Sequence, residues 1–115
     1  MRLIKNTPTA QTHGATVAQV TFSEPGNFGA VGSAEHRGIP VFAPKGISYA
    51  PSEGDNLLIL PVDGTDTCIG TLVYSAGLPA GELRLTSVGG AEIRLKNDGS
   101  ITLNGLTITK EGAVL

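Results

Sequence analysis

The stretch GELRLTSVGGAEIRLKNDGSITLNGLTITKEGAVL, residues 81–115, decides the fold of this chain. Apolar and polar residues alternate in it over short runs, with period two, and no helical periodicity competes. The alternating apolar positions are Leu83, Leu85, Ile93, Leu95, Ile101, Leu103, Leu106 and Ile108. Successive side chains of a strand point to opposite faces, so all eight are expected on one face of a ribbon of very short strands.

Turn residues separate the runs. They are Val88-Gly89-Gly90, Asn97-Asp98-Gly99, Asn104-Gly105 and Glu111-Gly112. Glycine and asparagine adopt the positive φ that tight hairpins need, and this explains these sites better than cation binding does. The polar positions of the strands, which are expected to face away from the apolar stripe, are Arg84, Arg94, Thr102, Thr107 and Thr109.

One copy of this ribbon has nothing in its own segment to cover its apolar face. Full burial of the eight side chains is worth roughly 12–24 kcal/mol per chain, and the conformational entropy of ordering the segment offsets most of it. We therefore expect the ribbon to self-associate, and three copies could enclose a dry triangular core. Dimers and fibrils remain open from the pattern alone. The charges that would oppose open-ended stacking are Arg84, Glu92, Arg94, Lys96 and Lys110.

Composition excludes several classes. The chain has 115 residues, 16 glycines, 16% charged residues and a net charge of −2. Glycine excess with scarce charge is typical of turn-dense β structure or of a protein that buries surface in an assembly. The acidic balance gives no general attraction to nucleic acid. The first residues lack the apolar core of a signal peptide, and no run is long enough for a membrane helix.

The part before the ribbon is predicted to be β structure as well. Strands are expected at 15–22, 37–42, 56–62 and 67–74, with a short strand or bend at 47–50, and turns at 24–29, 43–46 and 63–66. Pro40 implies an edge position or a bulge. This count and length suit a small closed barrel such as the OB-fold. The chain then divides into an N-terminal arm at 1–14, a barrel at 15–78 and the ribbon at 79–115.

No catalytic or metal-binding constellation emerges. The histidines His13 and His36 lack a partner at ligand spacing and are expected to be surface or loop residues. Cys68 falls in an apolar strand and is predicted to be a buried, inert thiol. Two carboxylate pairs, Asp63 with Asp66 and Glu53 with Asp55, are explained by turns. The glycine-rich stretch 26–32 has no following lysine or helix, so phosphate binding is not expected.

With these residues in view, Gly81–Leu85 and Ala91–Gly105 resemble the C-terminal needle of phage baseplate central-spike proteins. This is the baseplate assembly protein V family, which includes the Mu-like membrane-piercing spike. Three earlier stretches, Gly38–Gly46, Gly54–Pro61 and Cys68–Gly70, resemble the OB-fold that precedes the needle there. The resemblance covers roughly residues 15–112.

The resemblance implies an all-β homotrimer with an OB-fold collar and a short intertwined triple-stranded β-helix. It implies a structural virion component, not an enzyme, assembled in the bacterial cytoplasm at the tip of a tail. Such a spike caps the tube or hub, contacted through the OB-fold and the N-terminal arm, and pierces the host outer membrane. Many relatives carry a His-x-His iron site near the tip. No histidine follows His36 here, so no metal or cofactor is expected. The apolar end, Val114 and Leu115, could contact a separate tip-capping protein.

Other functional classes fit the sequence less well. The first alternative is an OB-fold binding module for nucleic acid or glycan, which would use aromatic stacking and a basic groove. The chain offers Phe22, Phe28, Phe42, Tyr49 and Tyr74, no tryptophan and an acidic balance. A cell-wall hydrolase would need an acid or nucleophile constellation, and a secreted β-solenoid would need an export signal. The sequence shows neither.

Overall fold

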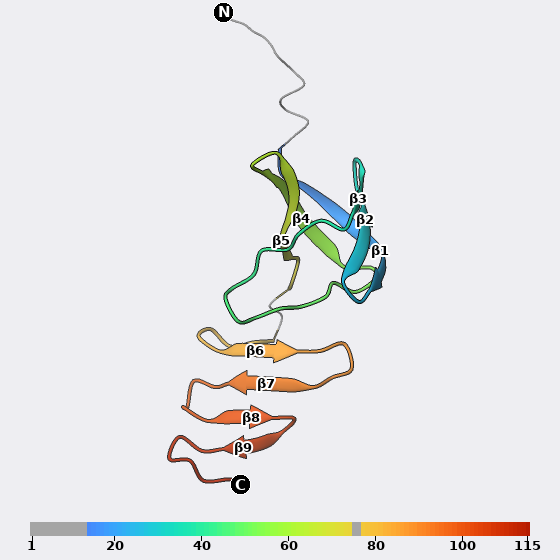
Figure 1. The fold of residues 1–115 in the computed structure, drawn as a ribbon. Helices are drawn as coiled ribbons and strands as arrows, with labels where there is room; N and C mark the ends of the chain where they lie inside the picture. Colours follow the sequence, from blue (N-terminus) through green and yellow to red (C-terminus); the bar gives the residue numbers. More distant parts are fainter. Residues whose placement is uncertain (1–13, 75–76) are drawn as a thin grey trace, which may run out of the picture. The chain divides into compact units, whose positions relative to one another are not determined.

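A computed structural model describes residues 14–74 and 77–115 (Figure 1). These residues contain nine β-strands in two antiparallel sheets and no helix, which confirms the predicted all-β class. No membrane-spanning helix therefore occurs within them. Contacts divide the chain into two units, an N-terminal unit that ends at Val73 and a C-terminal unit that begins at Tyr74.

The N-terminal unit holds one five-stranded sheet. Its strands are β1 (Thr16–Glu24), β2 (Asn27–Val31), β3 (Glu35–Arg37), β4 (Asn56–Val62) and β5 (Thr65–Thr71). Their order in the sheet is β3-β2-β1-β4-β5, and every neighbouring pair is antiparallel. The hairpin between β4 and β5 turns at Asp63 and Gly64, both at positive φ, as a two-residue primed turn requires.

The segment after β3 joins the two edges of this sheet. Pro40 accepts a hydrogen bond from the Cys68 amide at 2.9 Å, and the Phe42 amide donates to the Cys68 carbonyl at 2.9 Å. Val41 thereby forms a parallel bridge to Cys68 on β5. This segment directly follows β3 in the chain. The backbone pairing that starts at β3 therefore passes through β2, β1, β4 and β5 and ends at the residues that follow β3. Pro40 needs no amide hydrogen here, since only its carbonyl takes part.

Alternation along the strands gives this unit its core. The buried apolar residues are Ala18, Val20, Phe28, Ala30, Leu57, Ile59 and Cys68, with Ile39 and Val41 packed against them. The pairing of β1 with β2 shifts register between Val20 and Phe22, and that of β4 with β5 shifts between Leu58 and Ile59. Such bulges add local twist, which helps a small sheet to curve around its core.

Four predictions about this unit need correction. The segment 24–29 was expected to be a loop, but the turn is confined to Pro25 and Gly26, and β2 begins at Asn27. The strand expected at 37–42 ends at Arg37, because the chain leaves β2 at Gly38, which has a φ of 59°. Residues 47–50 form no strand. The returning strand, expected at 67–74, occupies 65–71 instead.

The C-terminal unit contains a plain meander. Its strands are β6 (Leu83–Thr86), β7 (Glu92–Leu95), β8 (Ile101–Leu103) and β9 (Leu106–Ile108), and they pair in chain order. Figure 1 shows them stacked as successive antiparallel rungs. Near the end of the chain, Val114 adds a further antiparallel bridge to Ile108.

Within residues 77–115 one type of hairpin occurs three times. In each, the residue before the loop donates its amide to the carbonyl four residues on, and a glycine amide donates back to it. The three pairs of bonds join Ser87 with Ala91 and Gly90, Lys96 with Ser100 and Gly99, and Thr109 with Ala113 and Gly112. These glycines have φ near +90°, which closes a three-residue loop with a bulge. The Asn104-Gly105 hairpin is shorter, with φ of 49° and 87°.

Candidate interface on the C-terminal ribbon

The register of the meander places the eight apolar residues on one face. Leu83 pairs with Leu95, Leu95 with Ile101, and Ile101 with Ile108. A second row runs through Leu85, Ile93, Leu103 and Leu106. Directly opposed residues of neighbouring strands point to the same side of the sheet. We call these eight side chains the ribbon's apolar face.

Little covers this face in the single chain. Seven of the eight side chains are exposed, from 36% for Ile101 to 64% for Leu83, and Ile108 is half-buried. A shallow hollow of about 340 Å³ lies beside the second row, with Leu85, Ile93 and Leu103 among its lining residues. A contiguous set of exposed aliphatic side chains is a candidate interaction surface.

The opposite face of the ribbon is polar. Its central row is Arg84, Arg94, Thr102 and Thr107, in direct register across the four strands. The Arg84 guanidinium lies 4.0 Å from the Glu92 carboxylate, and both side chains are about one-third exposed. The polar face thus presents charge and hydroxyl groups to water, while the apolar face has no such groups.

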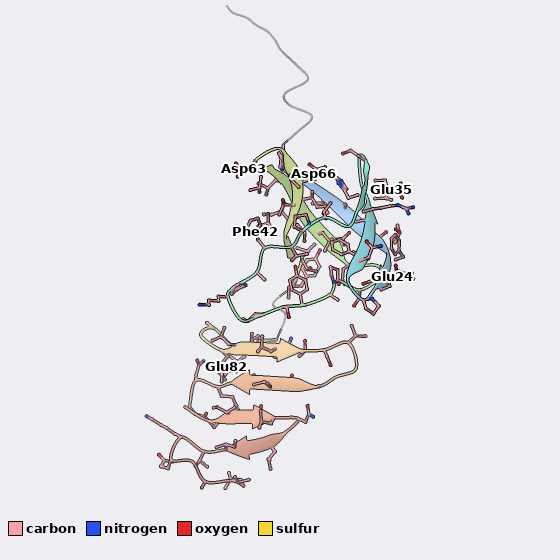
Figure 2. The ribbon with its side chains drawn as sticks, in the orientation of Figure 1. Glu24, Glu35, Phe42, Asp63, Asp66 and Glu82 are labelled. Atoms are coloured by element: carbon pink, nitrogen blue, oxygen red, sulfur yellow. The ribbon has the colours of Figure 1, made fainter. Side chains whose placement is uncertain are left out.

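Glu82 fastens the start of the ribbon to the turn between β7 and β8. Its Oε1 accepts hydrogen bonds from Arg94 Nε at 2.9 Å and Nη2 at 2.7 Å, and its Oε2 accepts the Asn97 amide at 3.0 Å (Figure 2 labels Glu82). The Asn97 side chain donates to the Ala80 carbonyl at 2.8 Å. The Asn97 amide, followed by Arg94, holds the pKa of Glu82 below its usual range, because both stabilise the ionised carboxylate.

Side chains also hold the turn that contains Asn97 from within, and they hold the Asn104-Gly105 hairpin. Asp98 accepts both the amide of Ser100 at 2.8 Å and its hydroxyl at 2.6 Å. The Ser100 hydroxyl, then its amide, lowers the pKa of Asp98. On the other edge, Asn104 accepts the Glu92 amide at 2.7 Å through its side chain and donates its own amide to the Glu92 carbonyl. The predicted turn residues are therefore structural in this unit.

The end of the chain is apolar and exposed. Val114 is 64% and Leu115 is 77% exposed, and the Leu115 amide donates to the Thr107 carbonyl at 2.9 Å. Thr109, which was expected on the polar face of a strand, lies instead in the last turn, where its hydroxyl accepts the Ala113 amide. Val114 and Leu115 are thus held as a short terminal rung with uncovered side chains.

The N-terminal unit places the other sequence candidates. Cys68 is fully buried and free, as predicted. Asp55 accepts the Ser52 amide in a tight turn, and Asp63 lies at the β4–β5 hairpin, so both are turn residues as expected. Asp66 lies in β5 rather than in the turn. Burial raises the pKa of Tyr49, which lies beside Cys68 and Thr71.

The expectation for His36 was wrong. His36 is a buried residue of β3, 7% exposed, and it shares the inner face with Ala30. Its Nδ1 lies 3.3 Å from Asp66 Oδ2, and its Nε2 has no hydrogen-bond partner among the described residues. The isolated histidine in a polar sequence context gave no signal of this burial. His13 and the rest of the predicted arm, except Gly14, lie outside the described residues.

The described residues contain no cluster of candidate metal ligands. In 14–74 and 77–115 no three histidine, cysteine, aspartate or glutamate side chains gather in a way that could hold a metal ion. The most distinctive chemistry is therefore the ribbon's apolar face. A comparison with protein-family models finds no matching family, and a comparison with curated proteins finds no match to this sequence.

Proposed function

We propose that this chain is a structural component of a phage tail or a tail-like injection machine. In this proposal three copies form a spike at the tip of the tail. The spike caps the tube or hub and is driven through the outer membrane of the host. The apolar end at Val114 and Leu115 then receives a separate tip-capping protein.

The ribbon's apolar face is the observation that carries the proposal. Seven exposed aliphatic side chains in two straight rows leave more apolar surface open than a soluble single chain usually tolerates. Two further copies of the same face would cover it. Strands of four residues span about 13 Å, a width at which three sheets can meet along an axis and exclude water between them.

The contact between copies in this proposal is face to face. The ladder bonds of β6 to β9 join neighbours of one chain, so each copy can form its meander first. We propose that three such meanders then close as a prism, with Arg84 and Arg94 outward. Such a prism resists axial load, because compression along its axis presses hydrogen-bonded rungs together and exposes no core.

The pairing order of the N-terminal unit supports the OB-fold part of the proposal. Five short strands pair in the order β3-β2-β1-β4-β5, and a single parallel bridge joins Val41 to β5. A ring of pairings of this kind is what a small, partly open five-stranded barrel requires. The proposal gives this unit the role of a collar that contacts the hub.

The charge of the N-terminal unit argues against the alternative of a nucleic-acid module. The N-terminal unit carries six carboxylates, namely Glu24, Glu35, Glu53, Asp55, Asp63 and Asp66, against the four basic residues Arg2, Lys5, Arg37 and Lys45, a net charge of −2. Phe28 is buried in the core, so it cannot stack on a base. A phosphate backbone would meet net repulsion on this unit.

Light scattering of the purified chain tests the proposal directly. The expected mass is about three times 11.7 kDa. Ile101→Asp places a charge in the middle of the first row and should abolish the trimer, because the assembled core would have to bury three carboxylates. The matched variant is Thr102→Asp, one residue along on the polar face, and it should keep the trimeric mass. A monomeric wild type, or an Ile101→Asp variant that stays trimeric, would refute the proposal.

A further inference from the structure

We infer that the N-terminal unit carries a second contact between copies, which closes only once the ribbons have assembled. The contact is the outer patch, which we define as Val17, Leu58, Ile69 and Leu72. Its occupant is the corresponding unit of the other copies. The inference rests on the proposed trimer.

The outer patch lies on the side of β1, β4 and β5 that faces away from the core. Val17 is directly opposite Leu58, while their neighbours Ala18 and Leu57 point inward and are buried. The four side chains are between 37% and 58% exposed. Gly70, the partner of Leu58 on β5, leaves open space where a side chain would stand. A hollow of about 340 Å³ results, lined almost entirely by apolar atoms.

The size of the patch argues for a tethered partner of its own kind. Four aliphatic side chains about half exposed offer on the order of 200 Å² of apolar surface. A stable interface between free proteins needs about 800 Å² on each partner. The patch is thus too small to recruit a free partner by itself. Ribbons that already hold three copies together would raise the local concentration to about the millimolar range, at which a weak contact closes.

Charge and chain connectivity also favour another copy of this unit as the partner of the patch. The unit has a net negative charge, which disfavours the approach of its copies, but none of the residues lining the hollow is charged. Two copies can therefore approach at this face without bringing carboxylates together. The patch also contains Leu72, the last patch residue before the chain passes to Leu83 of the ribbon eleven residues later. Eleven residues span at most about 40 Å, so the chain tethers each patch within that distance of its ribbon.

Thiol labelling of the full chain tests the inference. Val17→Cys introduces a reporter into the patch, Ser23→Cys places one on an exposed part of the same strand, and native Cys68 is buried and silent. Each variant is made in the wild-type background and together with Ile101→Asp. In the trimer, Val17→Cys should react with a maleimide at least about tenfold more slowly than Ser23→Cys. In the Ile101→Asp background the two cysteines should react at similar rates.

The outcomes separate the two proposals. Light scattering on the same samples reports whether the trimer exists, independently of labelling. A trimer in which Val17→Cys reacts as fast as Ser23→Cys would overturn the inference and leave the spike intact, with the patch open to a different protein. Slow labelling of Val17→Cys in both backgrounds would also overturn it, because the patch would then be covered within a single chain. A monomeric wild type would remove both proposals.

Discussion

At the residue scale, Glu82 shows how one carboxylate can fix the start of a β-meander. Its two oxygens accept three hydrogen bonds from Arg94 and Asn97, and Arg94 also lies in the central row of the polar face. A glutamate followed twelve residues later by arginine carries no obvious signal in the sequence. Only the hairpin between β6 and β7 brings the two side chains together.

The lowered pKa of Glu82 predicts acid sensitivity. The pKa of Glu82 in the folded protein lies below its unfolded value of about 4.3. Such a carboxyl group stabilises the fold at pH values above the unfolded pKa. This stabilisation is lost as the pH falls through the folded pKa. Asp98 acts in the same direction. Glu82→Gln should lower the urea midpoint at about pH 7. Between about pH 7 and about pH 3, the midpoint of this variant should fall by less than that of the wild type.

The control for this experiment is Glu111→Gln, at an exposed position of the last turn. Its urea midpoint should follow that of the wild type at both pH values. If Glu82→Gln loses as much stability on acidification as the wild type does, the Glu82 carboxylate is not a source of the acid response.

At the element scale, the hairpins of the ribbon depend on glycine to different degrees. Gly105 has a φ of 87°, and a Cβ at this position would meet no neighbour within 4 Å. The cost of Gly105→Ala is then the cost of the left-handed backbone alone, roughly 1 kcal/mol per chain. Chemical denaturation followed by circular dichroism measures it.

Gly89 offers the matched control for this prediction. Its φ is not positive, and a Cβ there would make only ordinary contact with Ser87 Oγ at 3.9 Å. Gly89→Ala should therefore be neutral or slightly stabilising, since alanine restricts the unfolded chain. Equal losses for the two variants would contradict the assignment of the turn types.

The ribbon was more predictable than the N-terminal unit, for reasons that lie in particular elements. Around Ile93 and Ile101, alternation and turn residues agree, so strand positions and their common face follow from local rules. The sequence of Asn27–Val31 resembles a loop, because it contains Gly29 and lies between two other glycines. Gly29 is needed there because a Cβ would collide with the ring of Phe22 on β1. Contacts of that kind, like the burial of His36, depend on which strands become neighbours.

At the scale of the whole molecule, the proposed trimer makes stability depend on protein concentration. Folded subunits that associate are stabilised by mass action, so the melting temperature of the ribbon should rise when the concentration is raised about tenfold. Calorimetry at two concentrations checks this. The N-terminal unit has its own core around Leu57 and Ile59.

The Ile101→Asp variant is the comparison for this experiment. It should show no concentration dependence in the melting of the N-terminal unit, because a monomer melts without dissociating. A melting temperature of the wild type that is unchanged over this range would argue that its ribbon is stable as a single chain.

The ladder bonds between β6 and β9 all join strands of the same polypeptide. In the proposed prism, in which three such meanders pack face to face, no strand is threaded through a neighbouring subunit. Subunits of the assembled spike could therefore come apart and re-form without unfolding. When two differently labelled preparations are mixed, trimers that contain both labels should form over time. Interwound chains would instead stay in the trimers in which they folded.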